Sequence, residues 1–155
     1  MRISRRELIV LGGVAGLAGC AGQRSDDGGA ALLDPLGEAP VEVGSAADYP
    51  HDGIYDRFRR SNNFFLVRHV DRLFAQSAIC PHRDCRNIAF SSGFRCPCHG
   101  STFTMDGNVT RGPARSDLPR IEMEQNPQGR LIVHLERRLI APGRFDAPQA
   151  FVVLA

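Results

Sequence analysis

Lysine is absent from this sequence, and its charges of opposite sign nearly balance. All 19 basic residues are arginines, set against 17 acidic residues, for a formal net charge of +2. Residues 1–19 contain three of the arginines and one of the acidic residues, so the remainder of the chain holds 16 of each sign. This balance does not produce the generally basic surface on which nucleic-acid binding depends. We therefore expect no nucleic-acid partner.

A long apolar run is also missing at the N-terminus. A basic start precedes an apolar stretch, Leu8–Ala18, of about eleven residues, whereas a transmembrane helix needs about 20. This length and the basic flank are typical of an export signal over residues 1–19. The motif S-R-R-E-L at residues 4–8 resembles a twin-arginine signal, which exports proteins that fold, and take up a cofactor, in the cytoplasm. The alternative is an ordinary signal whose basic region happens to contain two arginines.

Cysteine is scarce, and one of the five cysteines stands apart from the others. The motif L-A-G-C that ends at Cys20 is similar to a bacterial lipobox, in which the cysteine becomes the lipidated first residue. Lipidation would account for a fifth, odd cysteine in an exported protein, and several acyl chains would hold the chain at the outer, periplasmic face of the cytoplasmic membrane. The alternative is a plain cleaved signal or an uncleaved short anchor with Cys20 incidental. Residues 20–40, rich in glycine and proline, predict a flexible tether, and residues 41–155 a single folded domain.

The other four cysteines and two of the five histidines fall between residues 80 and 99. An all-thiolate metal site is possible, but Cys96 and Cys98 are one residue apart, a poorer spacing for a metal loop than C-x2-C. Pairing one cysteine and one histidine from each loop gives a better set. A structural zinc ion could use the same set. The remaining histidines, His51, His69 and His134, are expected to be structural or exposed. The six candidate ligands are Cys80, His82 and Cys85 in the first loop and Cys96, Cys98 and His99 in the second.

The order C-x-H, then C-x2-H, with one extra cysteine in each loop, resembles the Rieske family over roughly residues 60–135. The resemblance implies one [2Fe–2S] cluster, with Cys80 and Cys96 on one iron and His82 and His99 on the other. Neutral imidazoles in place of two thiolates make such a cluster less negative and easier to reduce.

The extra cysteines separate subfamilies. The resemblance implies that Cys85 and Cys98 form a disulfide that clamps the two loops. Oxygenase-type Rieske ferredoxins are a second alternative, but they typically lack this pair. Quinol-oxidising members carry an apolar first loop, C-T-H-L-G-C, whereas this chain has Arg83 and Asp84 there. Because burying these charges in an apolar quinol pocket would be costly, the first loop favours a transient, wetter encounter with a redox protein.

The resemblance also assigns roles to residues that would surround the cluster without binding it. Gly100 and Ser101 match the family's G-S, whose serine hydroxyl donates a hydrogen bond to a bridging sulfide and raises the potential. High-potential members have tyrosine where this chain has Phe103, so we expect a positive but intermediate potential. Gly112 and Pro113 resemble the family's proline loop, which covers the cluster.

Sixteen glycines, ten prolines and short alternating segments predict an all-β domain. The expected form is a Rieske-type antiparallel β-sandwich or barrel, with a cluster-binding subdomain built from hairpins over roughly residues 77–115. The expected hairpins lie at residues 64–77, 88–95, 101–109 and 121–135, with a closing strand at 151–154.

The function expected from the sequence is one-electron transfer by a lipid-anchored carrier or electron-transfer subunit, with a c-type cytochrome or an oxidoreductase as partner. No catalytic residue is expected, because nothing resembles a substrate pocket. The alternatives are the Rieske subunit of a quinol–cytochrome c oxidoreductase and a zinc-stabilised binding module.

Overall fold

The computed structural model describes residues 33–154. The export signal expected over residues 1–19, the lipidation site Cys20 and the start of the tether lie outside the described residues. Within residues 33–154, no helix is both long enough and apolar enough to cross a bilayer.

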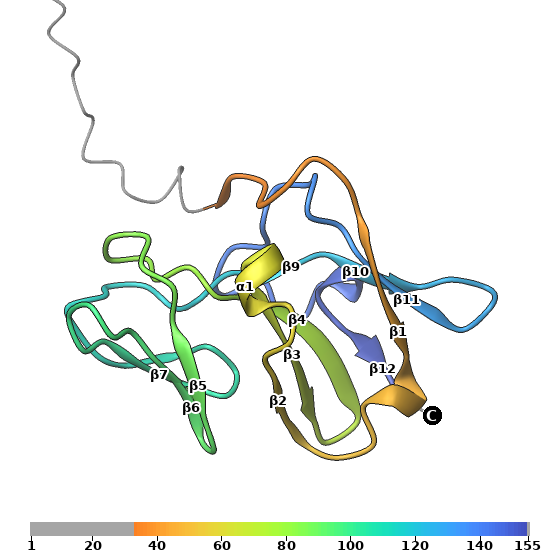
Figure 1. The fold of residues 1–155 in the computed structure, drawn as a ribbon, viewed down its shortest axis with the longest axis horizontal. Helices are drawn as coiled ribbons and strands as arrows, with labels where there is room; N and C mark the ends of the chain where they lie inside the picture. Colours follow the sequence, from red (N-terminus) through yellow and green to blue (C-terminus); the bar gives the residue numbers. More distant parts are fainter. Residues whose placement is uncertain (1–32, 155) are drawn as a thin grey trace, which may run out of the picture.

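Three antiparallel sheets make up the described chain, which confirms the all-β prediction (Figure 1). The first sheet has the order β1 (Val41–Ser45), β11 (Arg130–Val133), β10 (Met123–Gln125). The second has the order β12 (Val152–Val153), β4 (Arg72–Ser77), β3 (Phe64–His69), β2 (Gly53–Tyr55), with β9 (Arg120–Ile121) also paired with β4. The third, the cluster sheet, has the order β5 (Ile88–Phe90), β6 (Gly93–Arg95), β7 (Thr102–Thr104), β8 (Val109–Arg111). The helical segments are short: η2 (Ala46–Asp48), α1 (Arg59–Asn62) and η3 (Pro148–Ala150).

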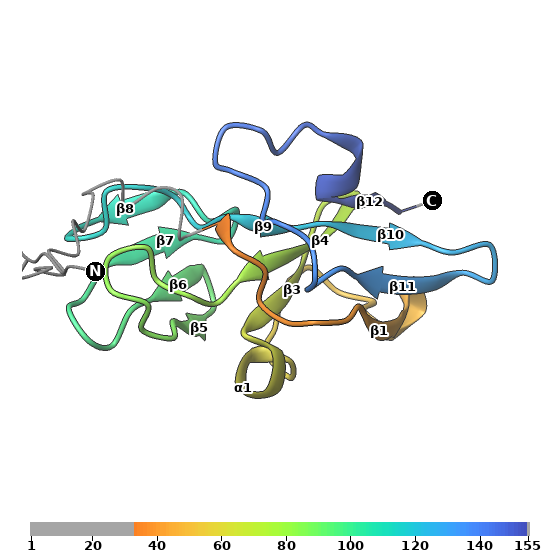
Figure 2. The same ribbon diagram turned by 90° about the horizontal axis from the view of Figure 1, so that it is seen from above.

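The hairpin predicted over residues 64–77 is present as β3 and β4, and it forms the centre of the molecule. Its strands pair from Phe64 with Ser77 to His69 with Arg72. Four consecutive β3 residues, Phe64 to Val67, are fully buried, so both faces of this strand are covered and not only one. Figure 2 shows the cluster sheet at one end of an elongated molecule, β10 and β11 at the other, and β3, β4 and β9 between them.

The cluster sheet is a meander with one buried face. Phe94 and Phe103 are cross-strand partners and are both buried, and the Phe94 ring packs 4.8 Å from the ring of Phe65 in β3. Gly93 allows β6 and β7 to approach closely, because a Cβ atom there would lie 2.0 Å from the Phe103 carbonyl oxygen. The cluster sheet is therefore fixed to the central hairpin through aromatic packing.

Two segments differ from the sequence prediction. Residues 46–62, for which the sequence predicts no hairpin, contain η2, β2 and α1. In the other segment, Leu33 and Leu36 pack against the core, and the N–H of Leu139 donates to the carbonyl of Leu33 at 2.9 Å. The tether expected over residues 20–40 thus includes a part that contacts the domain.

Candidate metal centre

The first loop runs from the end of β4 to the start of β5 and closes on itself through its backbone. The N–H of Cys80 donates to the carbonyl of Cys85 at 2.8 Å, and the N–H of Asp84 donates to the carbonyl of Cys80 at 2.9 Å. Asp84 has a φ of 54°, in the left-handed region, which aspartate tolerates better than most residues do. The loop is therefore a defined turn with Cys80 at its root.

The second loop, between β6 and β7, repeats this pattern. The N–H of Cys96 donates to the carbonyl of Ser101 at 2.8 Å, and the N–H of Gly100 donates to the carbonyl of Cys96 at 3.0 Å. Gly100 is left-handed with a φ of 77°, so it occupies the place that Asp84 has in the first loop. Both loops thus present a cysteine four residues before a left-handed residue.

The two remaining thiols lie at the roots of these loops. Cys80 and Cys96 are the free cysteines of the described chain, and both are buried. Burial and the neighbouring Cys96 thiol raise the pKa of the Cys80 thiol, against the opposing effect of the His82 backbone and the Ser101 hydroxyl. A thiol of this kind is deprotonated when it binds a metal ion, so the buried pair suits iron or zinc.

The two histidine rings of the loops lie side by side. The ring centroids of His82 and His99 are 4.8 Å apart, with an interplanar angle of 86°. His99 is exposed and His82 is half-buried. The Nδ1 atom of His82 is buried and has no hydrogen-bond partner among the described residues. Because a buried polar atom normally has a partner, this nitrogen fits a metal ligand, and the site as a whole fits a cluster with two thiolates and two imidazoles.

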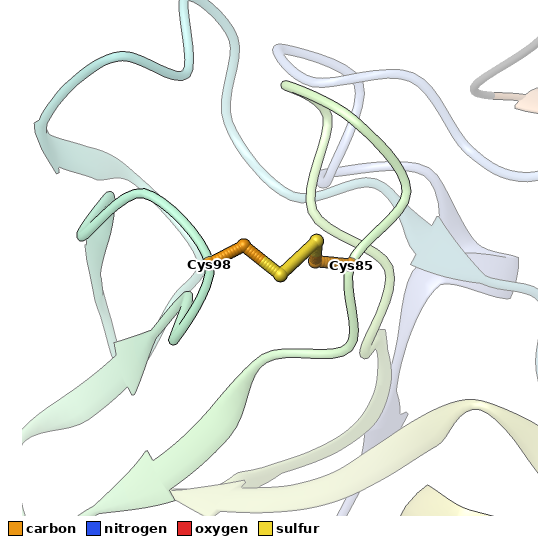
Figure 3. The surroundings of a disulfide bond; sticks show 2 residues. All are labelled: Cys85 and Cys98. Atoms are coloured by element: carbon orange, nitrogen blue, oxygen red, sulfur yellow. A yellow bond between two sulfur atoms is a disulfide. The ribbon is translucent and has the colours of Figure 1, made fainter.

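A disulfide joins the two loops, as predicted. Cys85 and Cys98 are bonded, with their Cα atoms 6.5 Å apart (Figure 3). The sulfurs of Cys85, Cys96 and Cys98 lie within 4.8 Å of one another, but the two disulfide sulfurs are not thiolates. An all-thiolate site made from the four cysteines is therefore excluded in this state, and the clamp lies directly beside Cys96.

Ser101 connects the second loop to the segment that follows β8. Its side chain is buried, and its Oγ atom accepts a hydrogen bond from the N–H of Ala114 at 2.9 Å. The Ser101 hydroxyl also opposes the rise in the pKa of the Cys80 thiol, and its proton is not used in the hydrogen bond with Ala114. Gly112 and Pro113, just before Ala114, are exposed. Phe103 is buried and carries no hydroxyl that could act as a further donor.

The sequence did not predict the hydrogen bonds through which Asn63 holds the two ends of the first loop. Asn63 follows α1 with a left-handed φ of 60°. Its carbonyl accepts from the N–H of Ala78 at 2.8 Å, and its Oδ1 atom accepts from Nε of Arg86 at 2.7 Å. An asparagine between a charged segment and an apolar strand is a weak signal for such a cap. No other feature of the sequence indicates these contacts.

Asp106, in the turn between β7 and β8, joins the cluster sheet to the central sheet. Its Oδ1 atom lies 3.3 Å from Nδ1 of His69 and 3.6 Å from Nη2 of Arg120. Arg120 is buried with its guanidinium 3.7 Å from the Phe74 ring centroid. Burial lowers the pKa of Arg120 to about 10, and the charge of Asp106 opposes that change. His69 therefore has a structural contact. So does His134, whose Nδ1 atom lies 2.9 Å from Oε1 of Glu136.

Comparison with known proteins identifies relatives. Residues 39–122 match the sequence profile of a family described as the Rieske [2Fe-2S] domain. The chain is 33% identical over 111 residues to the chloroplastic cytochrome b6-f complex iron-sulfur subunit of Triticum aestivum, covering 67% of this chain and 50% of that one. It is 34% identical over 84 residues to the mitochondrial cytochrome b-c1 complex subunit Rieske of Gallus gallus, covering 52% and 26%.

The chain spans about half the length of the first of these curated relatives. Among solved structures, the plasma membrane Rieske protein PetC3 of Synechocystis PCC 6803 is 27% identical. The match has a TM-score of 0.48 and covers 60% of this chain and 97% of that one.

Proposed function

This chain belongs to the Rieske [2Fe-2S] domain family, and on that premise we propose that it transfers single electrons at the outer face of the cytoplasmic membrane. One observation carries the proposal. Two buried free thiols and two adjacent imidazoles converge from paired loops, while the other two loop cysteines are joined in a disulfide. This donor set fits a Rieske cluster better than it fits an all-thiolate site.

The bound [2Fe–2S] cluster would supply one reversible electron. Cys80 and Cys96 would hold one iron from the roots of the loops, where burial keeps water from the thiolates. His82 and His99 would hold the other iron, with the exposed His99 ring closest to solvent. An electron could therefore leave through the histidine side without passing through the protein core.

The chain would act as an electron-transfer protein or oxidoreductase subunit rather than as a stand-alone enzyme. A signal over residues 1–19 and lipidation of Cys20 would place it at the periplasmic side of the membrane. In cells, replacement by Cys20→Ser should move the protein from the membrane fraction to the soluble periplasmic fraction. Continued membrane retention of this variant would contradict the lipid anchor.

The proposed partner is a c-type cytochrome or a partner oxidoreductase. The names of the relatives favour a second candidate, the Rieske subunit of a quinol–cytochrome c oxidoreductase. The charges of the first loop oppose it, because Arg83 and Asp84 are exposed beside His82 and would have to enter an apolar pocket unpaired.

Mixing experiments distinguish the two candidates. The reduced full-length chain is mixed with an oxidised c-type cytochrome, and the oxidised chain with a short-chain quinol. We expect rapid oxidation by the cytochrome and no direct reduction by the quinol. Reduction by the quinol without electron exchange with the cytochrome would contradict the carrier role. A His82→Ala variant, which lacks one expected ligand, is the control and should show neither reaction.

A further inference from the structure

A row of side chains crosses the cluster sheet beside the metal centre. In the strand register, Ile88 is paired with Arg95, Arg95 with Thr102, and Thr102 with Arg111. Cross-strand partners share one face of a sheet, so these four side chains lie together. Arg95 directly precedes Cys96, and Thr102 follows the end of the second loop. The row is therefore the part of the sheet nearest both loops.

This face is exposed, in contrast to the aromatic face beneath it. Ile88 is 40% exposed and Phe90, two residues along the same strand, is 43% exposed. Together they are half of the four large exposed hydrophobic residues in the described part of the chain. Arg95 and Arg111 are exposed as well, and neither forms a salt bridge to any residue between 33 and 154. We call Ile88, Phe90, Arg95 and Arg111 the outer face of the cluster sheet.

The charges of the segment over residues 78–117, which contains both loops and the cluster sheet, favour the same face. Residues 78–117 contain five arginines and three aspartates. Two of the aspartates are engaged elsewhere: Asp106 lies against His69 and Arg120, and Asp117 accepts the N–H of Val109 at 2.7 Å. The outer face thus combines two apolar side chains with two arginines that form no salt bridge within residues 33–154.

We propose that the outer face of the cluster sheet, Ile88, Phe90, Arg95 and Arg111, docks an acidic surface of the protein that exchanges electrons with this chain. The inference rests on the proposed electron-transfer function and adds the chemistry of the partner. Apolar anchors with arginines around them are the composition of protein interfaces. An acidic partner would pair the arginines and be steered toward the cluster end of the molecule.

A second copy of the chain fits this face less well. In a two-fold dimer the same patch meets itself, so the arginines of one copy would approach those of the other. An anionic membrane could attract the arginines, but two partly exposed apolar side chains provide little surface to insert. An acidic protein surface can form salt bridges with both arginines and also cover the apolar side chains of Ile88 and Phe90.

The test measures electron-transfer rates of the full-length chain loaded with its cluster. Stopped-flow mixing uses two c-type cytochromes, one of net negative and one of net positive charge. The double variant Arg95→Glu/Arg111→Glu should react about tenfold more slowly with the acidic cytochrome at low salt, and the difference should vanish at high salt. The matched control, Arg60→Glu/Arg138→Glu, reverses two exposed arginines outside the cluster subdomain and should react like the wild type.

A second variant, Ile88→Ser/Phe90→Ser, should slow the reaction and leave its salt dependence unchanged. The EPR signal and midpoint potential of every variant are recorded first, because a missing cluster would defeat the proposed function and not this inference. With the cluster intact, equal rates for Arg95→Glu/Arg111→Glu and its control would overturn the docking site. Binding of these arginines to phosphatidylglycerol vesicles with no change in the rate would assign the face to the membrane and also overturn it.

Discussion

At the scale of single residues, Ser101 connects the metal centre to the surrounding fold. Its Oγ atom accepts a hydrogen bond from the N–H of Ala114, and its hydroxyl lowers the pKa of the Cys80 thiol against the effect of burial. A donor near a ligand sulfur stabilises the reduced, more negative form of a cluster. We therefore expect this hydroxyl to raise the potential, while its hydrogen bond with the N–H of Ala114 holds the segment after β8 in place.

The variant Ser101→Ala should lower the midpoint potential, by up to about one tenfold change in the redox equilibrium, or ~59 mV for one electron. It should also destabilise the domain by about 1–3 kcal/mol, because the N–H of Ala114 loses its acceptor in a buried place. Potentiometric titration and thermal unfolding measure the two effects. An unchanged potential in a destabilised variant would leave Ser101 with a structural role alone.

The resemblance to the family implies a tyrosine hydroxyl in high-potential members at the position of Phe103. The substitution Phe103→Tyr should raise the midpoint potential, since the new donor would stabilise the reduced cluster. Phe74→Tyr, in a buried aromatic residue of the central sheet, is the control and should leave the potential unchanged. A potential that stays constant or falls in Phe103→Tyr would contradict this explanation.

Asp84 has the left-handed conformation that Gly100 has in the second loop. A β-branched residue at that φ is strained, so Asp84→Val should destabilise the domain by roughly 1–2 kcal/mol. Asp84→Gly should be near neutral, because glycine adopts the conformation without a Cβ clash. Chemical denaturation of the cluster-loaded protein compares the two variants. Equal stability of both would show that the turn is not restrained at this residue.

The residues proposed as ligands could be picked out from the sequence because their types and spacing match the motif of the family. The hydrogen bonds that hold the two loops in place could not be predicted from the sequence. The contacts of Ser101 with Ala114 and of Arg86 with Asn63 join residues 13 and 23 positions apart. Nothing local in the sequence specifies which polar groups such loops bring together.

At the scale of structural elements, the two loops resemble each other more than their sequences do. Each is closed by an N–H of its first cysteine and by a left-handed residue four positions later. The histidines nevertheless take different positions, two residues after Cys80 and three after Cys96. The two loops thus have similar turns although their sequences differ. The disulfide between Cys85 and Cys98 holds one turn against the other.

Removal of the clamp by Cys85→Ala/Cys98→Ala should lower the free energy of unfolding by roughly 3 kcal/mol, the value typical of a short disulfide-closed loop. The variant should also lose its visible absorbance faster in the presence of an iron chelator, because the loops can separate. A double variant as resistant to the chelator as the wild type would show that the ligand bonds alone hold the loops together.

The hairpins of the domain were predictable, because alternating apolar residues and turn residues are local signals. β3 with β4 and β5 with β6 lie where those signals place them. β2 and α1 were missed, since the three residues of β2 carry no alternation and form a strand by pairing with β3. Such an element depends on contacts with residues distant in the sequence and has no local signal.

At the scale of the whole molecule, the cluster sheet must be held at a fixed orientation to the central sheet. Aromatic packing between Phe94 and Phe65 provides one contact, and Asp106 against Arg120 provides another. The contact of Leu33 and Leu36 with the core also became visible only in the fold, because isolated leucines in a polar stretch do not indicate a docking site.

The ion pair of Asp106 and Arg120 predicts a double-mutant result. Asp106→Leu should cost about 1–2 kcal/mol, since the buried Arg120 loses its partner while the carboxylate is partly solvated. Adding Arg120→Met should recover most of that loss, because no buried charge then remains. Denaturant unfolding of the two single variants and the double variant gives the coupling free energy. Additive effects would mean that the pair does not join the two sheets.

The most direct test of the central claim is a redox titration of the full-length chain, followed by low-temperature EPR and metal analysis. We predict two irons per chain and a rhombic Rieske signal that appears on reduction at positive potential. A protein that contains zinc and gives no signal would contradict the electron-transfer account. A Rieske signal that appears only at clearly negative potential would instead contradict a high-potential type of cluster and the role of Ser101 in raising its potential.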